Sequence, residues 1–348
     1  MNKERILKIT AAGDVFMPGT VRWSNGDFVA ADEEKGKLVM DKVVDCFLNS
    51  DINFCNLEAP ISDRGKPMAG RAAAFRSYPS MAEVLKKNNI TFVSLANNHS
   101  LDYGWEALAD TMARLDSLGI GYSGAGKNIA EARQPTIIEK KGMKVGLLSY
   151  TTNVNTPLGF KASENRYGLN PIRISPFLPD HVNMDDLETM QKDVAEWQKK
   201  TDFLVVSCHW GISEGGTHMV TRYQELIAHC AIDAGADMII GHHPHALQPI
   251  EIYKDKPIIY SLANFIFALE EDFPRENILF QCVFSKHKIY EVKFIPCYMN
   301  QNNYPEVVSP EDERGQKIIN LMRKLCTKYG IRLKVKEETG EVICSNKD

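Results

Sequence analysis

Three histidines late in the chain, His242, His243 and His245, flank Pro244 directly after the apolar stretch 238–240. Proline fixes its own backbone φ and biases the residue before it towards extended geometry. We therefore expect His243 and His245 to form an extended turn and to face one point. Neutral imidazole is the commonest metal ligand in proteins, and a close pair suits Zn, Mn or Fe. Taken alone, the motif is equally compatible with a polar loop that is rich in histidine.

Four further residues with oxygen or imidazole nitrogen donors come just after apolar runs: Asp14, Glu58, Asn98 and His209. No cysteine is among the candidates, which favours a catalytic centre with open coordination positions over a structural zinc site. Six ligands exceed what one ion needs, so a carboxylate bridging two ions is the economical arrangement, and it serves hydrolysis of phosphate esters and related bonds. Each residue alone has an ordinary alternative: a turn for Asp14, an Asx cap for Asn98, or a hydrogen-bonded core histidine for His209.

The elements that must position these residues are strands alternating with helices. Short apolar runs predict strands at 6–12, 52–57, 90–95, 145–150, 203–208, 238–240 and 257–262. Apolar residues at helical spacing predict helices at 38–49, 105–118, 187–197 and 221–234. This order is typical of an α/β core with much parallel pairing, in which ligands gather at the carboxyl ends of strands. Beyond about 275 the alternation stops, and we expect a hairpin at 278–284 and 289–295, a helix near 311–328 and two final strands around Gly340.

Composition excludes several classes of protein. The chain has 348 residues, of which 44% are hydrophobic and 25% charged, as in an ordinary soluble globular protein. The net charge of −4 argues against a general surface for nucleic acid or anionic membranes. The eight cysteines form no C-x-x-C pair and resemble buried thiols of a reducing compartment. The first apolar run is too short for a signal peptide or membrane helix, so we expect a cytoplasmic protein without a membrane segment.

The stretch 151–180 lies between two predicted core strands and is rich in proline, glycine and polar residues. Such a long connection is often functional. We expect it to be a surface excursion that covers the ligand cluster as a lid and moves more than the core.

Several short motifs occur in order between about 8 and 268: Gly13-Asp14-Val15, Asn56-Leu57-Glu58-Ala59-Pro60, Phe75-Arg76, Ala96-Asn97-Asn98-His99, His209-Trp210-Gly211, Gly241-His242-His243-Pro244-His245 and Tyr260-Ser261-Leu262-Ala263-Asn264-Phe265. On these motifs the chain resembles the CapA (PgsA) family of capsule and poly-γ-glutamate synthesis, within the calcineurin-like metallophosphoesterase superfamily. The resemblance implies a four-layer αββα sandwich over residues 1–272. Residues 273–348 carry no such motif and would form a small α+β strand/helix extension packed on it.

The resemblance also implies roles for individual residues. One divalent ion (Mn, Zn or Fe) would be held by Asp14, Glu58 and His245, and the second by Glu58, Asn98, His209 and His243. His99 would not be a ligand but would stabilise the leaving group as an acid or hydrogen-bond donor. Arg76 is a candidate for holding an anionic substrate group through its planar guanidinium, with an ordinary surface arginine as the alternative. Asn264 is the second candidate for substrate binding.

Two departures from the superfamily pattern affect the first ion. The superfamily usually has histidine two residues after the first aspartate, where this chain has Phe16, and its bridging residue is usually aspartate, where this chain has Glu58. The first ion would therefore have few ligands, and either one or two ions fit the sequence.

The leading hypothesis is a metal-dependent hydrolase that acts on a phosphate ester or on a γ-glutamyl or similar amide, related to capsule or poly-γ-glutamate biosynthesis. Its substrate would be a small molecule or a polymer. The rival is a non-catalytic accessory protein that binds polymer in the same cleft. A scaffold stabilised by zinc fits poorly, because no cysteine is among the candidate ligands.

Overall fold

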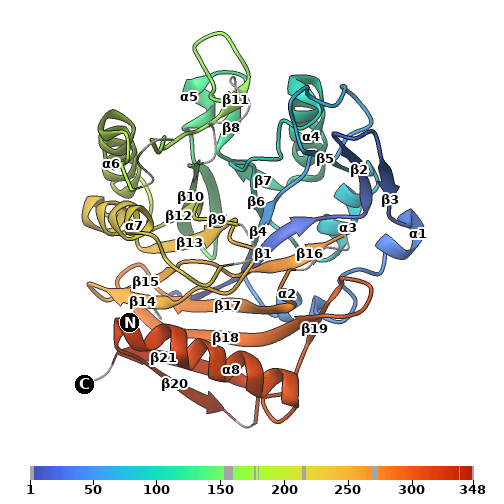
Figure 1. Ribbon diagram of the computed structural model, residues 1–348. Coiled ribbons are helices and arrows are strands. Elements are labelled where there is room, and N and C mark those ends of the chain that lie inside the picture. Colours follow the sequence, from blue (N-terminus) through green and yellow to red (C-terminus); the bar gives the residue numbers. More distant parts are fainter. Residues whose placement is uncertain are drawn as a thin grey trace.

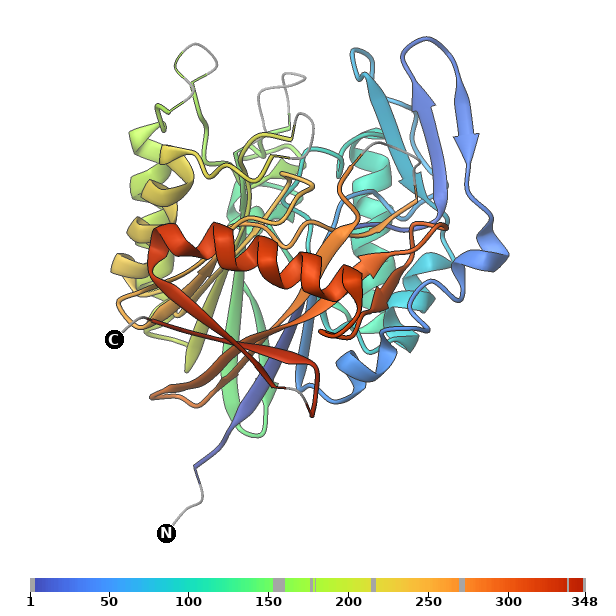
Figure 2. The same ribbon diagram turned by 60° about the horizontal axis from the view of Figure 1, so that its bottom comes forward.

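The computed structural model describes residues 4–152, 160–175, 178, 180–213, 217–268, 273–336 and 338–346. Two large β-sheets share one hydrophobic core, and helices pack on the other face of each sheet (Figures 1 and 2). This mixed architecture confirms the predicted α/β class. Of the helices in the described ranges, none combines the length and the apolar character needed to cross a bilayer.

The first sheet has the strand order β20-β21-β18-β17-β1-β4-β6-β7, with β16 beside β1 and β19 beside β18. Strand β1 runs parallel to β4 and β16 and antiparallel to β17. The bounds are β1 Leu7–Phe16, β4 Ile52–Leu57, β6 Phe92–Ser94, β7 Gly121–Ser123, β16 Asn264–Phe267, β17 Glu276–Phe284, β18 Ile289–Met299, β19 Pro305–Val307, β20 Ile331–Lys336 and β21 Glu341–Asn346.

The second sheet has the order β14-β15-β13-β12-β10-β9. Its neighbours β10, β12, β13 and β15 are all parallel, as the alternation of strands and helices predicts. The bounds are β9 Thr136–Lys140, β10 Met143–Thr151, β12 Phe203–His209, β13 Met238–His242, β14 Ile250–Tyr253 and β15 Lys256–Ile259.

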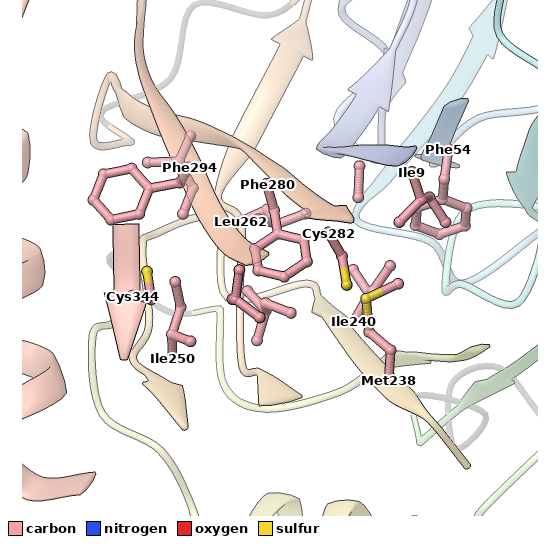
Figure 3. Close-up of a cluster of buried hydrophobic side chains, with 14 of the residues drawn as sticks. Ile9, Phe54, Met238, Ile240, Ile250, Leu262, Phe280, Cys282, Phe294 and Cys344 are labelled. Atoms are coloured by element: carbon pink, nitrogen blue, oxygen red, sulfur yellow. The ribbon is translucent and has the colours of Figure 1, made fainter. Parts of the chain in front are cut away.

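The central strands are buried on both faces, which explains why they read as continuous apolar runs. In β4, Phe54 faces the core between the sheets, whereas Cys55 and Leu57 face the helices on the other side. In β12, Val205 likewise faces the core between the sheets, and Val206 faces the helices on the other side. Figure 3 shows the shared core, where side chains of both sheets meet.

Five helices of the described ranges lie on the outer faces of the two sheets. Those near 105–118, 187–197 and 221–234 confirm the prediction, whereas of the segment predicted at 38–49 only 44–48 is an α-helix. On the first sheet they are α2 Val44–Leu48, α3 Met81–Lys87 and α4 Gly104–Leu118, and on the second α6 Met184–Gln198 and α7 Arg222–Ala234. Helix α7 begins with a capping box between Thr221 and Gln224 and ends at Gly235 in a left-handed conformation. Smaller elements are α1 Glu33–Gly36, α5 Ile129–Ala132, β8 Ala125–Gly126 and β11 Gly168–Leu169.

A small sheet of order β3-β2-β5 was not predicted from the sequence. Its strands are β2 Gly19–Trp23, β3 Phe28–Ala30 and β5 Ala73–Ser77. A Cβ atom on Gly19 would lie 2.0 Å from the carbonyl oxygen of Arg76, so only glycine allows β2 to approach β5 this closely. This sheet stands beside α4, at the edge of the site described below (Figure 1).

The C-terminal segment continues the first sheet, because β17 is hydrogen-bonded directly to β1. Its elements confirm the predicted hairpin, helix and final strands, with the helix α8 at Glu313–Cys326 followed by the short 3-10 helix η1 at Thr327–Tyr329. Ile318 and Met322 of α8 belong to the same core as the two sheets. The boundary predicted between 272 and 273 adjoins residues 269–272, which lie outside the described ranges, and stays a proposal.

Candidate metal centre

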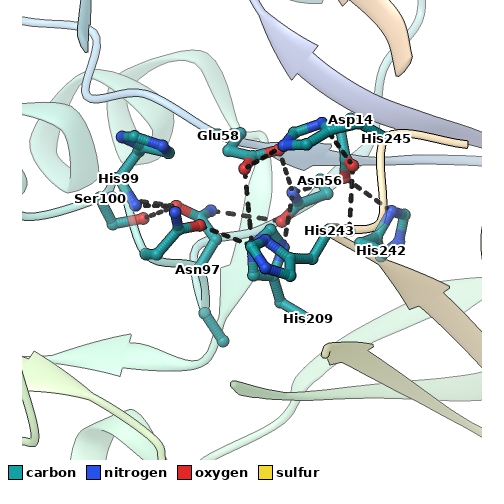
Figure 4. Close-up of polar contacts among 12 residues, drawn as sticks. Asp14, Asn56, Glu58, Asn97, His99, Ser100, His209, His242, His243 and His245 are labelled. Carbon is teal, nitrogen blue, oxygen red and sulfur yellow. Dashed lines mark hydrogen bonds and ion pairs between the residues drawn. The ribbon is translucent and has the colours of Figure 1, made fainter. Parts of the chain in front are cut away.

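Five of the predicted ligands lie at or just beyond the carboxyl ends of strands: Asp14 in β1, Glu58 after β4, His209 in β12, and His243 and His245 after β13. Strands β1 and β4 belong to the first sheet and β12 and β13 to the second. The carboxyl ends of parallel strands from both sheets therefore bring the five side chains to one place (Figure 4).

The ligand atoms form two groups of three within 4.8 Å of one another, namely Glu58, His243 and His245, and Asp14, Glu58 and His209. Glu58 belongs to both, as expected of a bridging carboxylate. The pairing of the other residues differs from the one that the family resemblance implies, although His245 Nδ1 also lies 3.7 Å from Asp14 Oδ2. The division of ligands between two ions stays a prediction.

Asn98, the sixth predicted ligand, belongs to the same cluster. Its Oδ1 atom lies 2.7 Å from Nε2 of His209. An amide oxygen and an imidazole are thus side by side at the edge of the group, as the prediction of a shared ion requires.

Unsatisfied buried atoms indicate that the cluster fits a cation. Glu58 Oε1 and His243 Nδ1 have no hydrogen-bond partner among the described residues, and both side chains are buried. A buried polar atom without a partner costs roughly 1–3 kcal/mol, so such atoms are rare unless something binds them. Carboxylates and imidazoles together suit Zn, Mn or Fe.

The pKa values of the two carboxyl groups are shifted in opposite directions. Burial, followed by the charges of Asp14 and Asp102, raises the pKa of Glu58 well above its usual value. Burial also acts to raise the pKa of Asp14, but the imidazoles of His242 and His245 and the backbone N–H of His243 together outweigh it, and the pKa falls below the ordinary value. A cation beside Glu58 would reverse its shift, because an opposite charge favours the ionised form.

The imidazoles are kept neutral. Burial, followed by the neighbouring His243, lowers the pKa of His209 well below its usual value. Burial lowers the pKa of His243 to about 3, and the pKa of His245 is also lowered, first by burial. A neutral imidazole retains the lone pair that a metal ion binds.

Asparagines behind the ligands fix their orientation. Asn56 Nδ2 donates to Asp14 Oδ1 at 2.9 Å and lies 3.3 Å from His209 Nδ1. Asn97 Nδ2 donates in turn to Asn56 Oδ1 at 3.2 Å. Such outer partners hold metal ligands in place. The sequence contained a signal for both asparagines, because Asn56 shares a motif with Glu58 and Asn97 directly precedes Asn98.

Asn264 has the same relation to His245, because its Oδ1 atom accepts a hydrogen bond from His245 Nδ1 at 2.7 Å. It does not line the cleft described below. This placement indicates that Asn264 orients a ligand, and its predicted role in substrate binding stays a prediction.

His242 belongs to the same motif as His243 and His245, but the sequence predicted no role for it. Its side chain is fully buried, and its Nδ1 atom lies 3.2 Å from Asp14 Oδ1. The ring packs against Phe54 of the core, with centroids 5.4 Å apart. His242 thus supports Asp14 from the side of the core.

The expectation of an extended turn at the histidines is wrong. His243 has φ +95° and His245 has φ +55°, both in the left-handed region that residues other than glycine rarely adopt. The backbone N–H of His243 donates to Asp14 Oδ2 at 3.0 Å, which holds this conformation. Strain of roughly 1–3 kcal/mol per residue is typical of functional sites.

A cleft of about 420 Å³ opens above the cluster and is lined by Gly70, Arg71, Ala72, Ala73, Phe75, Asn98, His99, Ser213, His243, His245, Phe267 and Phe273. His99, the predicted acid, lies in its wall with 12% of its side chain exposed. A larger cavity of about 710 Å³ beside α8 contains none of the predicted site residues.

His99 is held by three neighbours. Its Nδ1 atom lies 2.6 Å from Oδ2 of the buried Asp102, and Nη2 of Arg71 lies 2.6 Å from Oδ1 of the same carboxylate. The ring of Phe75 stacks on the imidazole with centroids 4.0 Å apart. A carboxylate accepts and so favours a proton on Nδ1, although Nη2 of Arg71, which can only donate, also lies 2.9 Å from this atom.

Phe16, which replaces the usual histidine, supplies no ligand. It stacks on Phe75 with centroids 4.9 Å apart and meets Phe267 edge-on at 5.9 Å. Phe16 thereby supports the aromatic ring on which His99 rests.

Arg76 does not line the cleft, and its guanidinium lies 4.2 Å from the ring centroid of Tyr103. Arg71 occupies the cleft wall instead. Sequence reasoning missed Arg71 because it lies in a polar loop without periodicity. The substrate role predicted for Arg76 stays a prediction.

The lid expected at 151–180 is described only in part, since residues 153–159, 176–177 and 179 lie outside the described ranges. Phe160 and Leu169 are fully buried in the core of the first sheet's helices. The guanidinium of Arg71 lies 5.4 Å from the ring centroid of Phe160. The described part therefore packs beside the site.

The family model of the bacterial capsule synthesis protein PGA_cap matches residues 8–269. The chain belongs to this family. The match includes every predicted site residue and ends before β17.

Two relatives illustrate the family. The PGA biosynthesis protein CapA of Bacillus subtilis (strain 168) is 28% identical over 323 residues, covering 92% of this chain and 78% of the relative. A "Probable polyglutamine synthesis accessory protein" of Mycobacterium tuberculosis (strain CDC 1551 / Oshkosh) is 29% identical over 257 residues, covering 73% of this chain and 62% of that protein. The chain has a TM-score of 0.45 to the solved structure "GAP50 the anchor in the inner membrane complex of Plasmodium", at 9% identity over 92% of this chain and 95% of that one.

Proposed function

We propose that this member of the capsule synthesis family is a metal-dependent hydrolase acting on a phosphate ester or on a γ-glutamyl or similar amide of capsule or poly-γ-glutamate metabolism. The observation that carries the proposal is the convergence of two carboxylates and three neutral imidazoles below a cleft whose wall contains His99. We propose also that the two sheets and their covering helices are the four-layer αββα sandwich of the metallophosphoesterase type.

Asp14, Glu58, His209, His243 and His245 would hold one or two divalent ions, with Asn98 at the edge of the set. When bound, the ions supply Lewis-acid chemistry, which polarises a phosphoryl or carbonyl oxygen and activates water. The outer asparagines and His242 keep the ligands oriented so that little reorganisation is needed on binding.

His99 provides the proton that the departing group requires. Asp102 accepts the Nδ1–H of His99, so the Nε2 side is directed to the substrate. In the protonated imidazole, Nε2–H donates to the departing oxygen or nitrogen as the scissile bond breaks. General acid catalysis of this type contributes about 10²–10⁴ in rate.

Phe75 and Arg71 keep this acid in place and shape its surroundings. The stacked ring of Phe75 fixes the plane of the imidazole, and Arg71 pairs with the carboxylate that orients it. Phe267 and Phe273 add apolar surface to the cleft, which excludes water from the reacting groups.

The accessory role is the second candidate, because the relative from Mycobacterium tuberculosis carries that word in its name. In this role the same cleft would bind polymer without cleaving it. A turnover assay on phosphodiesters and γ-glutamyl amides, run with protein loaded with Mn, Zn or Fe, separates the two. Turnover that depends on His99 supports the hydrolase, whereas tight binding without turnover supports the accessory role.

A further inference from the structure

A second groove, of about 700 Å³, adjoins the cleft. Its lining residues are Arg22, Trp23, Ser24, Lys66, Pro67, Met68, Ala69, Gly70, Arg71, Ala72 and Ala74. Gly70, Arg71 and Ala72 also line the cleft, so the two spaces share one wall. A molecule bound at the metal centre can therefore extend past Arg71 into the groove.

The groove is basic in a protein whose net charge is −4. Three cationic side chains line it, and no carboxylate is among its lining residues. Arg71 is paired with Asp102. Arg22 and Lys66 are exposed, and neither forms an ion pair with any described residue, so both retain their full charge for a ligand.

Backbone hydrogen bonds connect the groove to Asp102, which pairs with His99. The backbone N–H of Met68 donates to the carbonyl oxygen of Asp102 at 2.8 Å, and that of Ser24 donates to the carbonyl oxygen of Ala72 at 2.9 Å. Asp102 also holds Arg71 and His99 through its side chain. One residue thus fixes both the acid and the loop that carries the groove.

We propose that this groove is a second anion-binding subsite of the hydrolase. Arg22 and Lys66 bind a carboxylate or phosphate group that lies away from the scissile bond, on a chain whose reacting group is at His99. Trp23 and Met68 provide apolar walls for the part of the chain between its charges. The inference rests on the proposed function, since the subsite serves a substrate anchored at the metal centre.

The test compares three metal-loaded proteins at low salt. They are the wild type, the groove variant Arg22→Gln/Lys66→Gln, and a control variant Lys42→Gln/Lys140→Gln, which removes two exposed cations that line neither space. Fluorescence anisotropy measures binding of a labelled oligo-γ-glutamate and of a labelled linear oligophosphate. Each protein is also titrated with Mn or Zn after chelation, which reports on the metal centre alone.

We expect the groove variant to bind at least one of the two chains about tenfold more weakly, since each exposed ion pair contributes modestly. Its metal affinity and the chain affinity of the control variant should be unchanged. The probe that loses affinity identifies the chemistry of the anion. A loss of chain affinity that is confined to the groove variant supports the subsite, even if no turnover is observed. The absence of turnover would overturn only the assignment as a hydrolase. Equal affinity of all three proteins for both chains overturns the subsite, whether or not turnover is observed.

Discussion

His99 Nδ1 and Asp102 Oδ2 lie 2.6 Å apart, and the carboxylate is fully buried. Asp102 is the third residue after His99, and its backbone N–H donates to the carbonyl oxygen of His99 at 3.0 Å. The turn between them therefore sets the pairing of imidazole and carboxylate. His99 itself lines the cleft together with the ligands His243 and His245.

His99→Asn should remove the acid and leave the metal centre intact. We expect kcat to fall by about 10²–10⁴ with metal content and Tm unchanged, because the lost step is proton donation. His287→Asn, at an exposed position, is the matched control. Wild-type turnover in His99→Asn would show that the imidazole has no catalytic role.

Asp102→Asn should differ from His99→Asn in stability. The carboxylate pairs with Arg71 and accepts the backbone N–H of Phe75 at 2.7 Å. Its loss removes the carboxylate that pairs with a largely buried guanidinium, and breaking a buried pair typically costs about 3–5 kcal/mol. Thermal unfolding should show a lower Tm for Asp102→Asn than for His99→Asn. Equal Tm values would show that the Arg71–Asp102 pair does not stabilise the fold.

Replacing a ligand should reduce metal affinity more than replacing its support. We expect His209→Ala and His243→Asn each to weaken binding of Mn or Zn more than about 100-fold, and Asn264→Ala about 10–100-fold through the lost bond to His245. Isothermal titration after chelation measures this order, with His287→Ala as the control. If Asn264→Ala raises KM and leaves metal affinity unchanged, Asn264 would be assigned to substrate binding instead.

Acid should destabilise the metal-free protein. Burial lowers the pKa of His243 to about 3 from the ordinary 6.5, so between these values the unfolded chain binds a proton that the folded protein does not. The free energy of unfolding therefore falls as pH drops from about 6.5 towards 3. Urea unfolding of chelated protein at about pH 7 and about pH 4.5 should show a smaller loss for His243→Asn than for the wild type. Asparagine suits the positive φ at this position. An equal loss would show that His243 does not titrate in this way.

The clustering of the candidate ligands could be predicted because of where they lie in the pattern. Each follows an apolar run, and the buried parallel strands that produce such runs end at one edge of their sheet. Glu58 and His209 came from these rules alone. Strands of three to five residues, such as β2 and β3, have too little periodicity to be detected.

Other parts of the site depend on tertiary contacts that no local pattern carries. Successive residues of a strand point to opposite faces, so once Phe75 stacks on His99, its neighbour Arg76 must face away, towards Tyr103. Arg71 reaches the site from a loop, through its contact with Asp102. The left-handed backbone of His243 could not be predicted either, because it depends on a hydrogen bond to Asp14, far away in sequence.

The most direct test of the central claim is turnover of one phosphodiester and one γ-glutamyl amide by the same protein, before chelation, after chelation, and after reloading with Mn, Zn or Fe. Metal content is measured at each step. We predict turnover of at least one substrate that is lost on chelation, returns with one or two equivalents of metal, and falls by about 10²–10⁴ in His99→Asn. A protein that binds one or two ions fully but hydrolyses neither substrate with any of these metals would contradict the assignment as a hydrolase.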